Sequence, residues 1–243
     1  MDFNKERHEY KKNGIIFTPV SDVISKATPE FEREQISKAV ANRDGLTQEE
    51  VLSDWDFKKE IACDLGNAIH KTIEHWIIHN TELNNSFLNS LVDKFPLSRE
   101  GLNSEKMVYD EDTYIAGTID IIEGSLEAER GDNREDVNLY DIKTNSGLEE
   151  SHGKLLEPFD DLENSKLNKY RMQLTLYKLL IEKMNNVNVK NLSIIQFDFD
   201  DMDWNMIEIE PVEKILELGL KGIADKLEIK PKKSMVDEAI INL

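Results

Sequence analysis

Residues 114–122 read YIAGTIDII, and residues 137–143 read VNLYDIK. Both runs are short and rich in β-branched and aromatic residues, and Gly, Asn and Asp lie between them, which is typical of neighbouring strands in a sheet. A third run of this kind, at 106–109, lies just before them. The middle of the chain therefore predicts three consecutive strands.

Helical patterns precede these strands. Thr28-Pro29 offers one helix start, and TQEE at 47–50 fits a capping box. From there, apolar residues recur at helical spacing to about His79, with Asp54 as a place where the helix can break. A second helix is predicted over 83–95, so the first third of the chain is expected to be mainly helical.

The pattern changes again after the strands. Residues 144–167 have no clear period and many acids, which is typical of lids, binding loops or disordered segments. A strong helix is predicted over 169–184, two strands over 192–199 and 204–209, and a last helix over 212–227. This order favours an α/β fold with a central mixed sheet flanked by helices.

The length of 243 residues is compatible with one domain, because α/β proteins of this size often form a single unit. We expect a single domain over 1–243, with a mainly helical part at 1–100 and a catalytic α/β core at 101–243. No apolar run approaches the roughly 20 residues of a bilayer span, and the N-terminus lacks a signal-peptide core. A cytoplasmic protein with no membrane partner is therefore the expectation.

Composition limits the chemistry. Cys63 is the only cysteine, which excludes an internal disulfide, a four-cysteine zinc site and a cysteine-held iron–sulfur cluster. No glycine-rich phosphate loop occurs, so no nucleotide cofactor is expected. The formal net charge of −19 opposes binding to a phosphate backbone, which depends on lysine and arginine. A nucleic-acid partner would need a narrow basic channel or a basic helper protein.

The run at 137–143 ends with Asp141 and Lys143, which lie two residues apart and so point to the same face of a strand. Ile142 points the other way, into the core. Alone, this spacing is common in surface ion pairs. The preceding run adds Asp120, an acid among isoleucines that is costly to bury unless a positive charge compensates it. A divalent metal shared with Asp141 is one such compensation.

Carboxylates around a divalent cation suit phosphodiester hydrolysis, which needs an activated water and neutralisation of charge on the phosphoryl oxygens. The two aspartates and the backbone carbonyl of Ile142 would leave coordination positions open for water and phosphate around Mg²⁺ or Mn²⁺. Lys143 can then orient or deprotonate the water, or stabilise the developing charge. The sequence does not choose between these roles.

Further candidates lie on the predicted helices. Gln173 and Tyr177 are spaced i, i+4 and share one helical face, and His70 lies among apolar positions of the long upstream helix. Each also has an ordinary interpretation. Tyr177 can be a core aromatic with a wet tip, Gln173 a surface residue and His70 a satisfied core histidine.

In order, four motifs resemble the RecB-like branch of the PD-(D/E)xK nuclease superfamily: GNAIH at 66–70, GTID at 117–120, DIKT at 141–144 and QLTLY at 173–177. Together they are far more specific than any one of them. The segment TPVSDVI at 18–24 also resembles the entry helix of mitochondrial and phage single-strand DNA exonucleases of this branch.

The resemblance implies a restriction-endonuclease-like core and a metal-dependent deoxyribonuclease, that is, a phosphodiester hydrolase. The residues that match the family's metal ligands are His70, Asp120, Asp141 and the carbonyl of Ile142. Gln173 and Tyr177 match a motif associated with positioning the nucleic acid and the active site. Glu105, on the strand before Asp120, is a further candidate carboxylate. No proline precedes Asp120, and cysteines for a cluster are missing, which favours the cluster-free exonucleases.

The leading hypothesis is a Mg²⁺- or Mn²⁺-dependent exonuclease that acts on single-stranded DNA or DNA ends in recombination, repair or replication. An endonuclease of the same superfamily stays open, because the catalytic core does not reveal whether ends are required. A catalytically silent module is the third hypothesis, in which an acidic surface mimics DNA or binds a protein partner.

Overall fold

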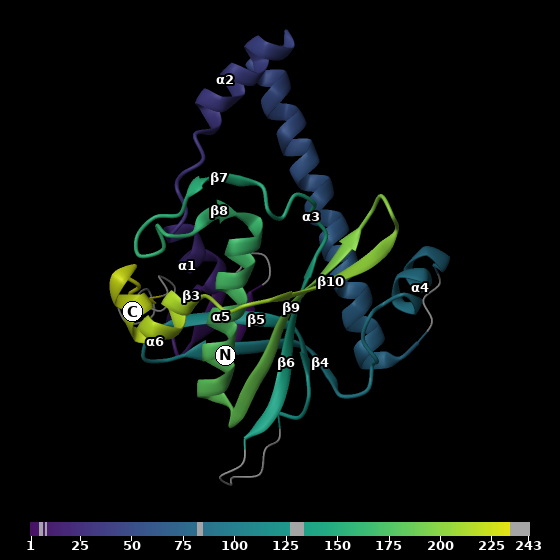
Figure 1. The fold of residues 1–243 in the computed structure, drawn as a ribbon, viewed down its shortest axis with the longest axis vertical. Coiled ribbons are helices and arrows are strands. Elements are labelled where there is room, and N and C mark those ends of the chain that lie inside the picture. The colour runs from purple at the N-terminus through teal and green to yellow at the C-terminus, as the bar shows by residue number, and fades with distance from the viewer. Residues whose placement is uncertain (5–6, 8, 82–84, 127–133, 234–243) are drawn as a thin grey trace, which may run out of the picture.

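The computed structural model describes residues 1–4, 7, 9–81, 85–126 and 134–233. Within these ranges the chain has an α/β fold with one large mixed sheet and helices packed against it (Figure 1). This confirms the expected α/β class with a mixed sheet flanked by helices. None of the helices in these ranges is both long and apolar enough to span a bilayer.

The large sheet has the order β1-β2-β3-β5-β6-β9-β10, with β4 paired to β5 and β11 paired to β3. Its strands are β1 (Asp2–Asn4), β2 (Glu9–Lys12), β3 (Ile15–Pro19), β4 (Leu102–Asp110), β5 (Ile115–Glu123), β6 (Glu135–Lys143), β9 (Val187–Asp198), β10 (Asp203–Ile209) and β11 (Lys232–Lys233). The antiparallel strands β4, β5 and β6 are the three predicted in the middle of the chain. Strands β9 and β10 are the predicted later pair, and β9 lies parallel to β6.

The helices of the described residues are α1 (Val20–Lys26), α2 (Arg33–Asp44), α3 (Gln48–His79), α4 (Ser86–Asp93), α5 (Lys166–Met184) and α6 (Glu213–Lys226). Successive strand residues point to opposite faces, so the central strands bury both sides. Ile122 and Leu139 join one core with α1, α5 and α6, while Ile121 and Ile142 join another with α3 and α4. The helices therefore cover both faces of the sheet.

The N-terminal part differs from its predicted helical character over the first 19 residues, which contribute β1, β2 and β3. Tyr10 and Phe17 lie opposite each other on β2 and β3 and are both buried. The turn between these strands is Asn13-Gly14, and both residues have positive φ. An Asn-Gly pair is the strongest short hairpin signal, and the helical interpretation overlooked it because the flanking strands are so short.

The predicted capping box is confirmed at the start of α3. Thr47 Oγ1 accepts from the backbone N–H of Glu50 at 3.2 Å, and Glu50 Oε2 accepts from the backbone N–H of Thr47 at 2.8 Å. The helix then runs unbroken for 32 residues, so the break considered at Asp54 does not occur. Thr28-Pro29 does not start a helix either, because α2 begins at Arg33.

Replacing Thr47 with alanine is expected to lower the free energy of unfolding by about 1 kcal/mol, because the amide of Glu50 loses its acceptor. For a chain of this size, the melting temperature should fall by about 2–4 °C. Differential scanning calorimetry measures this change. The control is Ser53→Ala on an exposed position of the same helix, which should not lower the melting temperature. Equal melting temperatures for Thr47→Ala and the wild type would contradict the role of the cap.

The acidic stretch after β6 is anchored and does not form a structureless loop. It contains a small sheet of β7 (Ser151–Lys154) and β8 (Glu163–Ser165). Leu155 and Phe159 are buried in the core with α5, and the amide of Leu156 donates to the carbonyl of Ala27 at 2.8 Å. The stretch has no helical or strand periodicity in its sequence because it forms a series of packed turns.

Candidate active site

A cleft of about 640 Å³ opens where β5 changes its neighbour. Along one edge, β5 pairs with β3 up to Ala116 and with β6 from Ile121 onward. Gly117, Thr118 and Asp120 lie between these two ladders and line the cleft.

The six candidate side chains from the four family-like motifs all line this cleft. They are His70 on α3, Asp120 on β5, Asp141 and Lys143 on β6, and Gln173 and Tyr177 on α5. The side chain of His70 is 29% exposed, which disfavours its interpretation as a core histidine. The fold thus brings together residues from four elements that are far apart in the sequence.

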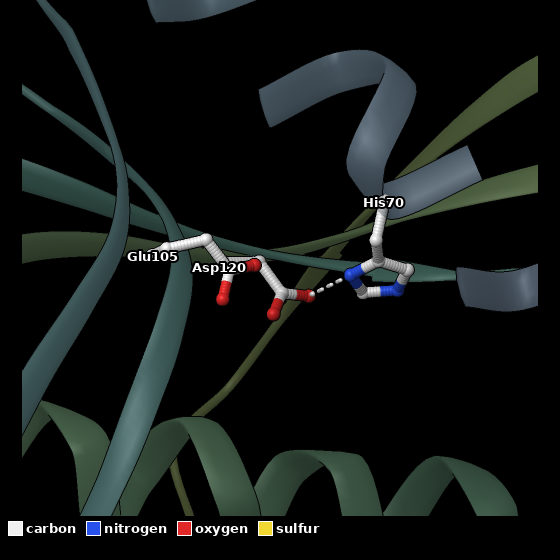
Figure 2. Close-up of side chains that lie close together, drawn as sticks. All are labelled: His70, Glu105 and Asp120. Carbon is white, nitrogen blue, oxygen red and sulfur yellow. Dashed lines mark ion pairs between the residues drawn. The ribbon is translucent and has the colours of Figure 1, made fainter. Parts of the chain in front are cut away.

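His70 is oriented by the backbone of β6. Its Nε2 lies 3.1 Å from the carbonyl oxygen of Ile142, which can only accept, so Nε2 carries a proton. In the neutral ring, Nδ1 then presents a lone pair 3.6 Å from Oδ2 of Asp120 (Figure 2). The same Oδ2 accepts from the amide of Ile142 at 2.8 Å. The backbone of Ile142 therefore orients both the imidazole ring of His70 and the carboxylate of Asp120. Hydrogen bonds of this kind commonly orient the ligands of metal sites.

Glu105 on β4 joins His70 and Asp120 in a compact cluster (Figure 2). One potential ligand atom from each residue lies within 4.8 Å of the other two. The backbone of Glu105 has a φ of 51°, and the β4–β5 ladder continues on both sides of this residue but omits it. A left-handed non-glycine residue costs about 1–2 kcal/mol and is found preferentially at functional sites. The unfavourable conformation occurs where the carboxylate enters the cleft.

Asp141 lies beside this cluster and is almost completely buried, with 1% of its side chain exposed. The Lys143 ammonium is 2.5 Å from Oδ2, and the Gln173 amide donates to Oδ1 at 2.9 Å. The same amide donates weakly to the Tyr177 hydroxyl at 3.4 Å. Apart from its ion pair, Oδ2 has no hydrogen bond of good geometry among the described residues. One oxygen of Asp141 is therefore fixed, and the other keeps capacity for a ligand.

The charges of the buried pair are set by opposing effects. The pKa of Asp141 is raised to about 6, because burial raises it by more than the nearby Lys143 lowers it. Burial also acts against the charged form of Lys143, but Asp141 and Asp120 outweigh it, so the pKa of Lys143 lies above its ordinary value. Its Nζ also lies 4.8 Å from the ring centre of Tyr170, a cation–π contact. This arrangement favours a charged lysine, which donates hydrogen bonds and cannot act as a base.

Tyr177 packs directly against Gly117, and its ring leaves no space for a larger residue at this position. A Cβ added to Gly117 would lie 2.4 Å from Cε1 of Tyr177, far inside contact distance. Burial raises the pKa of Tyr177 well above its ordinary value, so the hydroxyl stays neutral. Tyr177 is therefore a buried aromatic whose polar tip faces the site, as its ordinary interpretation expects, and its role in positioning the nucleic acid stays a prediction.

The sequence interpretation missed residues at the N-terminal side of the cleft. Phe3 and Tyr10 line it from β1 and β2, with ring centres 4.5 Å apart. The Tyr10 hydroxyl also forms a 2.9 Å hydrogen bond with the Thr118 hydroxyl on β5. The Asn13-Gly14 turn was the available signal for these strands.

The residues present fit a hard divalent cation. Glu105, Asp120 and Asp141 contribute −3 and Lys143 contributes +1, so the site carries −2 when these groups are ionised and His70 is neutral. Carboxylate oxygens with one imidazole nitrogen suit Mg²⁺ or Mn²⁺. Ligand atoms about 2.1 Å from one ion are at most about 4.2 Å apart, so a cluster spanning 4.8 Å needs only small side-chain movements.

Comparisons with known proteins do not assign a family. No family model matches the chain, and no curated protein matches it. A solved structure described as "Crystal structure of SSO0001" is similar over 98% of this chain and 81% of that chain, with 15% identity and a TM-score of 0.37. A TM-score this low supports no inference about function, so the interpretation depends on the residues of the site.

Proposed function

We propose that this chain is a divalent-metal-dependent deoxyribonuclease of the PD-(D/E)xK type, with a restriction-endonuclease-like core. The observation that carries the proposal is the convergence of Asp120, Asp141 and Lys143 in one cleft, next to His70 and Gln173. An ordinary surface ion pair needs neither a buried carboxylate nor a second acid beside it. Buried groups with shifted pKa values in a cleft are typical of catalytic sites.

Each residue has a distinct role in this proposal. His70, Glu105, Asp120 and Asp141 would hold Mg²⁺ or Mn²⁺, with the carbonyl of Ile142 as a further candidate ligand. The bound ion would supply a more acidic water and neutralise charge on the phosphoryl oxygens. Lys143 presents its ammonium to the attacking water or to the phosphoryl oxygen where negative charge develops.

The residues on α5 act through Asp141. Gln173 donates to its Oδ1, which fixes the carboxylate rotamer and leaves Oδ2 facing Lys143. The hydroxyl of Tyr177 accepts from the side-chain amide of Gln173, and the ring of Tyr177 packs against Gly117 in the lining of the cleft. These contacts hold the acidic group in place before substrate arrives, which lowers the cost of organising the transition state.

Degradation of DNA tests the proposal directly. A 5′-labelled single strand and a covalently closed single-stranded circle are incubated with Mg²⁺, with Mn²⁺ or with EDTA. We expect metal-dependent shortening of the linear strand and no cutting of the circle, as an exonuclease requires. Cutting of the circle would instead indicate an endonuclease. If folded protein leaves both DNAs intact in either metal, the nuclease proposal is wrong.

Metal binding gives a second prediction. Mn²⁺ at about 100 times its dissociation constant should stabilise the protein by about 2.7 kcal/mol, which raises the melting temperature by about 5–11 °C. Because the pKa of Asp141 is raised to about 6, protons compete with the ion in acid, and the increase should be smaller near about pH 5 than near about pH 7.5. Scanning calorimetry with and without EDTA measures both effects.

Two amide substitutions provide the controls. Asp120→Asn keeps an oxygen that can accept from the amide of Ile142 but removes the charge, so most of the Mn²⁺ effect should be lost. Asp136→Asn changes an exposed acid outside the cleft and should keep the full effect. Absence of any Mn²⁺ effect on the wild type would favour the silent DNA-mimic module, for which the net charge of −19 is the supporting observation.

A further inference from the structure

One wall of the cleft is the middle of α3, where the side chains are short or carry hydrogen-bond donors. The residues of this wall that precede His70 are Ala62, Cys63, Gly66 and Asn67. Lys71 and Glu74 continue the wall beyond His70. None of these residues except His70 belongs to the proposed metal and catalytic set.

Gly66 is not required by the packing of the protein. Glycine is unfavourable inside a helix, and α3 nevertheless continues for 32 residues through this position. A Cβ at Gly66 would meet only Oγ1 of Thr144, at an ordinary contact distance of 3.5 Å. Gly117 in the same cleft differs, because its Cβ would collide with Tyr177. Packing within the protein therefore explains why residue 117 is a glycine. It does not explain why residue 66 is one.

Asn67 and Lys71 supply donors on the same side of the helix. They are spaced i, i+4, so both side chains leave α3 in the same direction. Both are exposed, and neither has a hydrogen-bond or ion-pair partner in the described part of the chain. Glu74, one turn later, carries the opposite charge. The stretch favourable to an anion therefore runs from Gly66 to Lys71 and ends before Glu74.

We propose that the phosphates of the substrate strand pass along this stretch of α3. The absent side chain of Gly66 gives clearance to the sugar–phosphate backbone, and Asn67 and Lys71 donate to its phosphates. This inference rests on the proposed nuclease function and extends it by naming the wall that holds the strand. It also suggests how a strongly acidic protein can bind DNA, because the polar side chains of this wall up to Lys71 can donate hydrogen bonds to phosphates.

The salt dependence of binding tests Lys71. The probe is a fluorescein-labelled oligothymidylate of about 12 nucleotides, a length typical of single-strand sites, and anisotropy is measured in EDTA at several salt concentrations. Lys71→Gln should weaken binding and reduce the slope of log K against log salt by about 0.7, the value for one lost phosphate contact on a single strand. Lys226→Gln, which changes an exposed lysine on α6 outside the cleft, should keep the wild-type slope. A wild-type slope in Lys71→Gln overturns its role.

Clearance at Gly66 is tested by adding bulk. Gly66→Gln should weaken binding of the same oligonucleotide by at least about 10-fold, since small displacements at such sites have large effects. The milder Gly66→Ala should raise the melting temperature by about 2–4 °C, because alanine favours the helix, while it weakens binding. Ser53→Gln adds the same side chain to an exposed position of α3 outside the cleft and should bind normally. Wild-type affinity in both Gly66 variants overturns the clearance.

The results separate this inference from the proposed function. If the wild type binds and cuts DNA and the Lys71 and Gly66 variants behave like it, the phosphate path is wrong and the nuclease stands. If the wild type neither binds the oligonucleotide nor cuts DNA, both proposals are wrong. Selective loss of binding in the variants, with the Mn²⁺ effect on melting temperature retained, supports the path.

Discussion

The Lys143→Met variant is expected to cut DNA about 10²–10⁴-fold more slowly than the wild type. Methionine has a similar length and suits a buried position, but it has no charge to stabilise the phosphoryl oxygens or orient the water. Rates are measured under single-turnover conditions with saturating Mg²⁺, so that the chemical step is compared. Loss in the rate with little change in affinity for DNA would place the effect in the transition state.

The expected loss must be separated from damage to the site. Removing the ammonium also removes the partner of Asp141, so the pKa of this carboxyl should rise further, and rates are compared up to about pH 8.5. Recovery of the wild-type rate at high pH would mean that Lys143 serves only to keep Asp141 ionised. The matched control is Lys154→Met, which removes an exposed lysine outside the cleft and should keep full activity.

The Phe159→Ala variant should lose about 3–5 kcal/mol of stability, since truncation of a fully buried aromatic leaves a cavity. The melting temperature would fall by about 6–20 °C. Because Phe159 anchors the segment between β7 and β8 to the core, this segment should also become sensitive to limited proteolysis. Urea denaturation and mass spectrometry of the cleavage products measure the two effects.

The control for this substitution lies three residues away. Leu156 belongs to the same segment but is 46% exposed, so Leu156→Ala should lose much less stability than Phe159→Ala. Similar losses in the two variants would show that the segment is not held by its buried aromatic ring. The anchored conformation of the acidic stretch would then be wrong.

The parts of the fold with a strong local signal were predictable. β5 and β6 were recognised because short β-branched runs are bounded by turn residues, and α5 because its apolar residues recur at helical spacing. The N-terminal strands were not recognised, since they have only three to five residues and show no clear alternation, although β1, β2 and β3 pair with their neighbours in sequence. The packed turns near Phe159 also have no period to detect, because their burial depends on contacts with α1 and α5.

The site was predictable where the chemistry depends on spacing. Asp141 and Lys143 share a strand face, and the structure places them next to each other at one cleft with Asp120. The proposed binding of a metal by the two aspartates stays a prediction. Glu105 could be named only as a candidate, because its left-handed backbone conformation within a strand has no signature in the sequence. Tyr10 was missed along with its strand.

The two ladders that share one edge of β5 have a practical consequence for dissecting this protein. A fragment limited to 101–243 would contain three of the four family-like motifs, yet it would lack His70 and leave the backbone of β5 near Ala116 without the strand that covers it. Exposed strand edges invite association with other chains. The fragment should therefore aggregate. A shortened version of this protein that keeps the candidate site must also keep the first hundred residues.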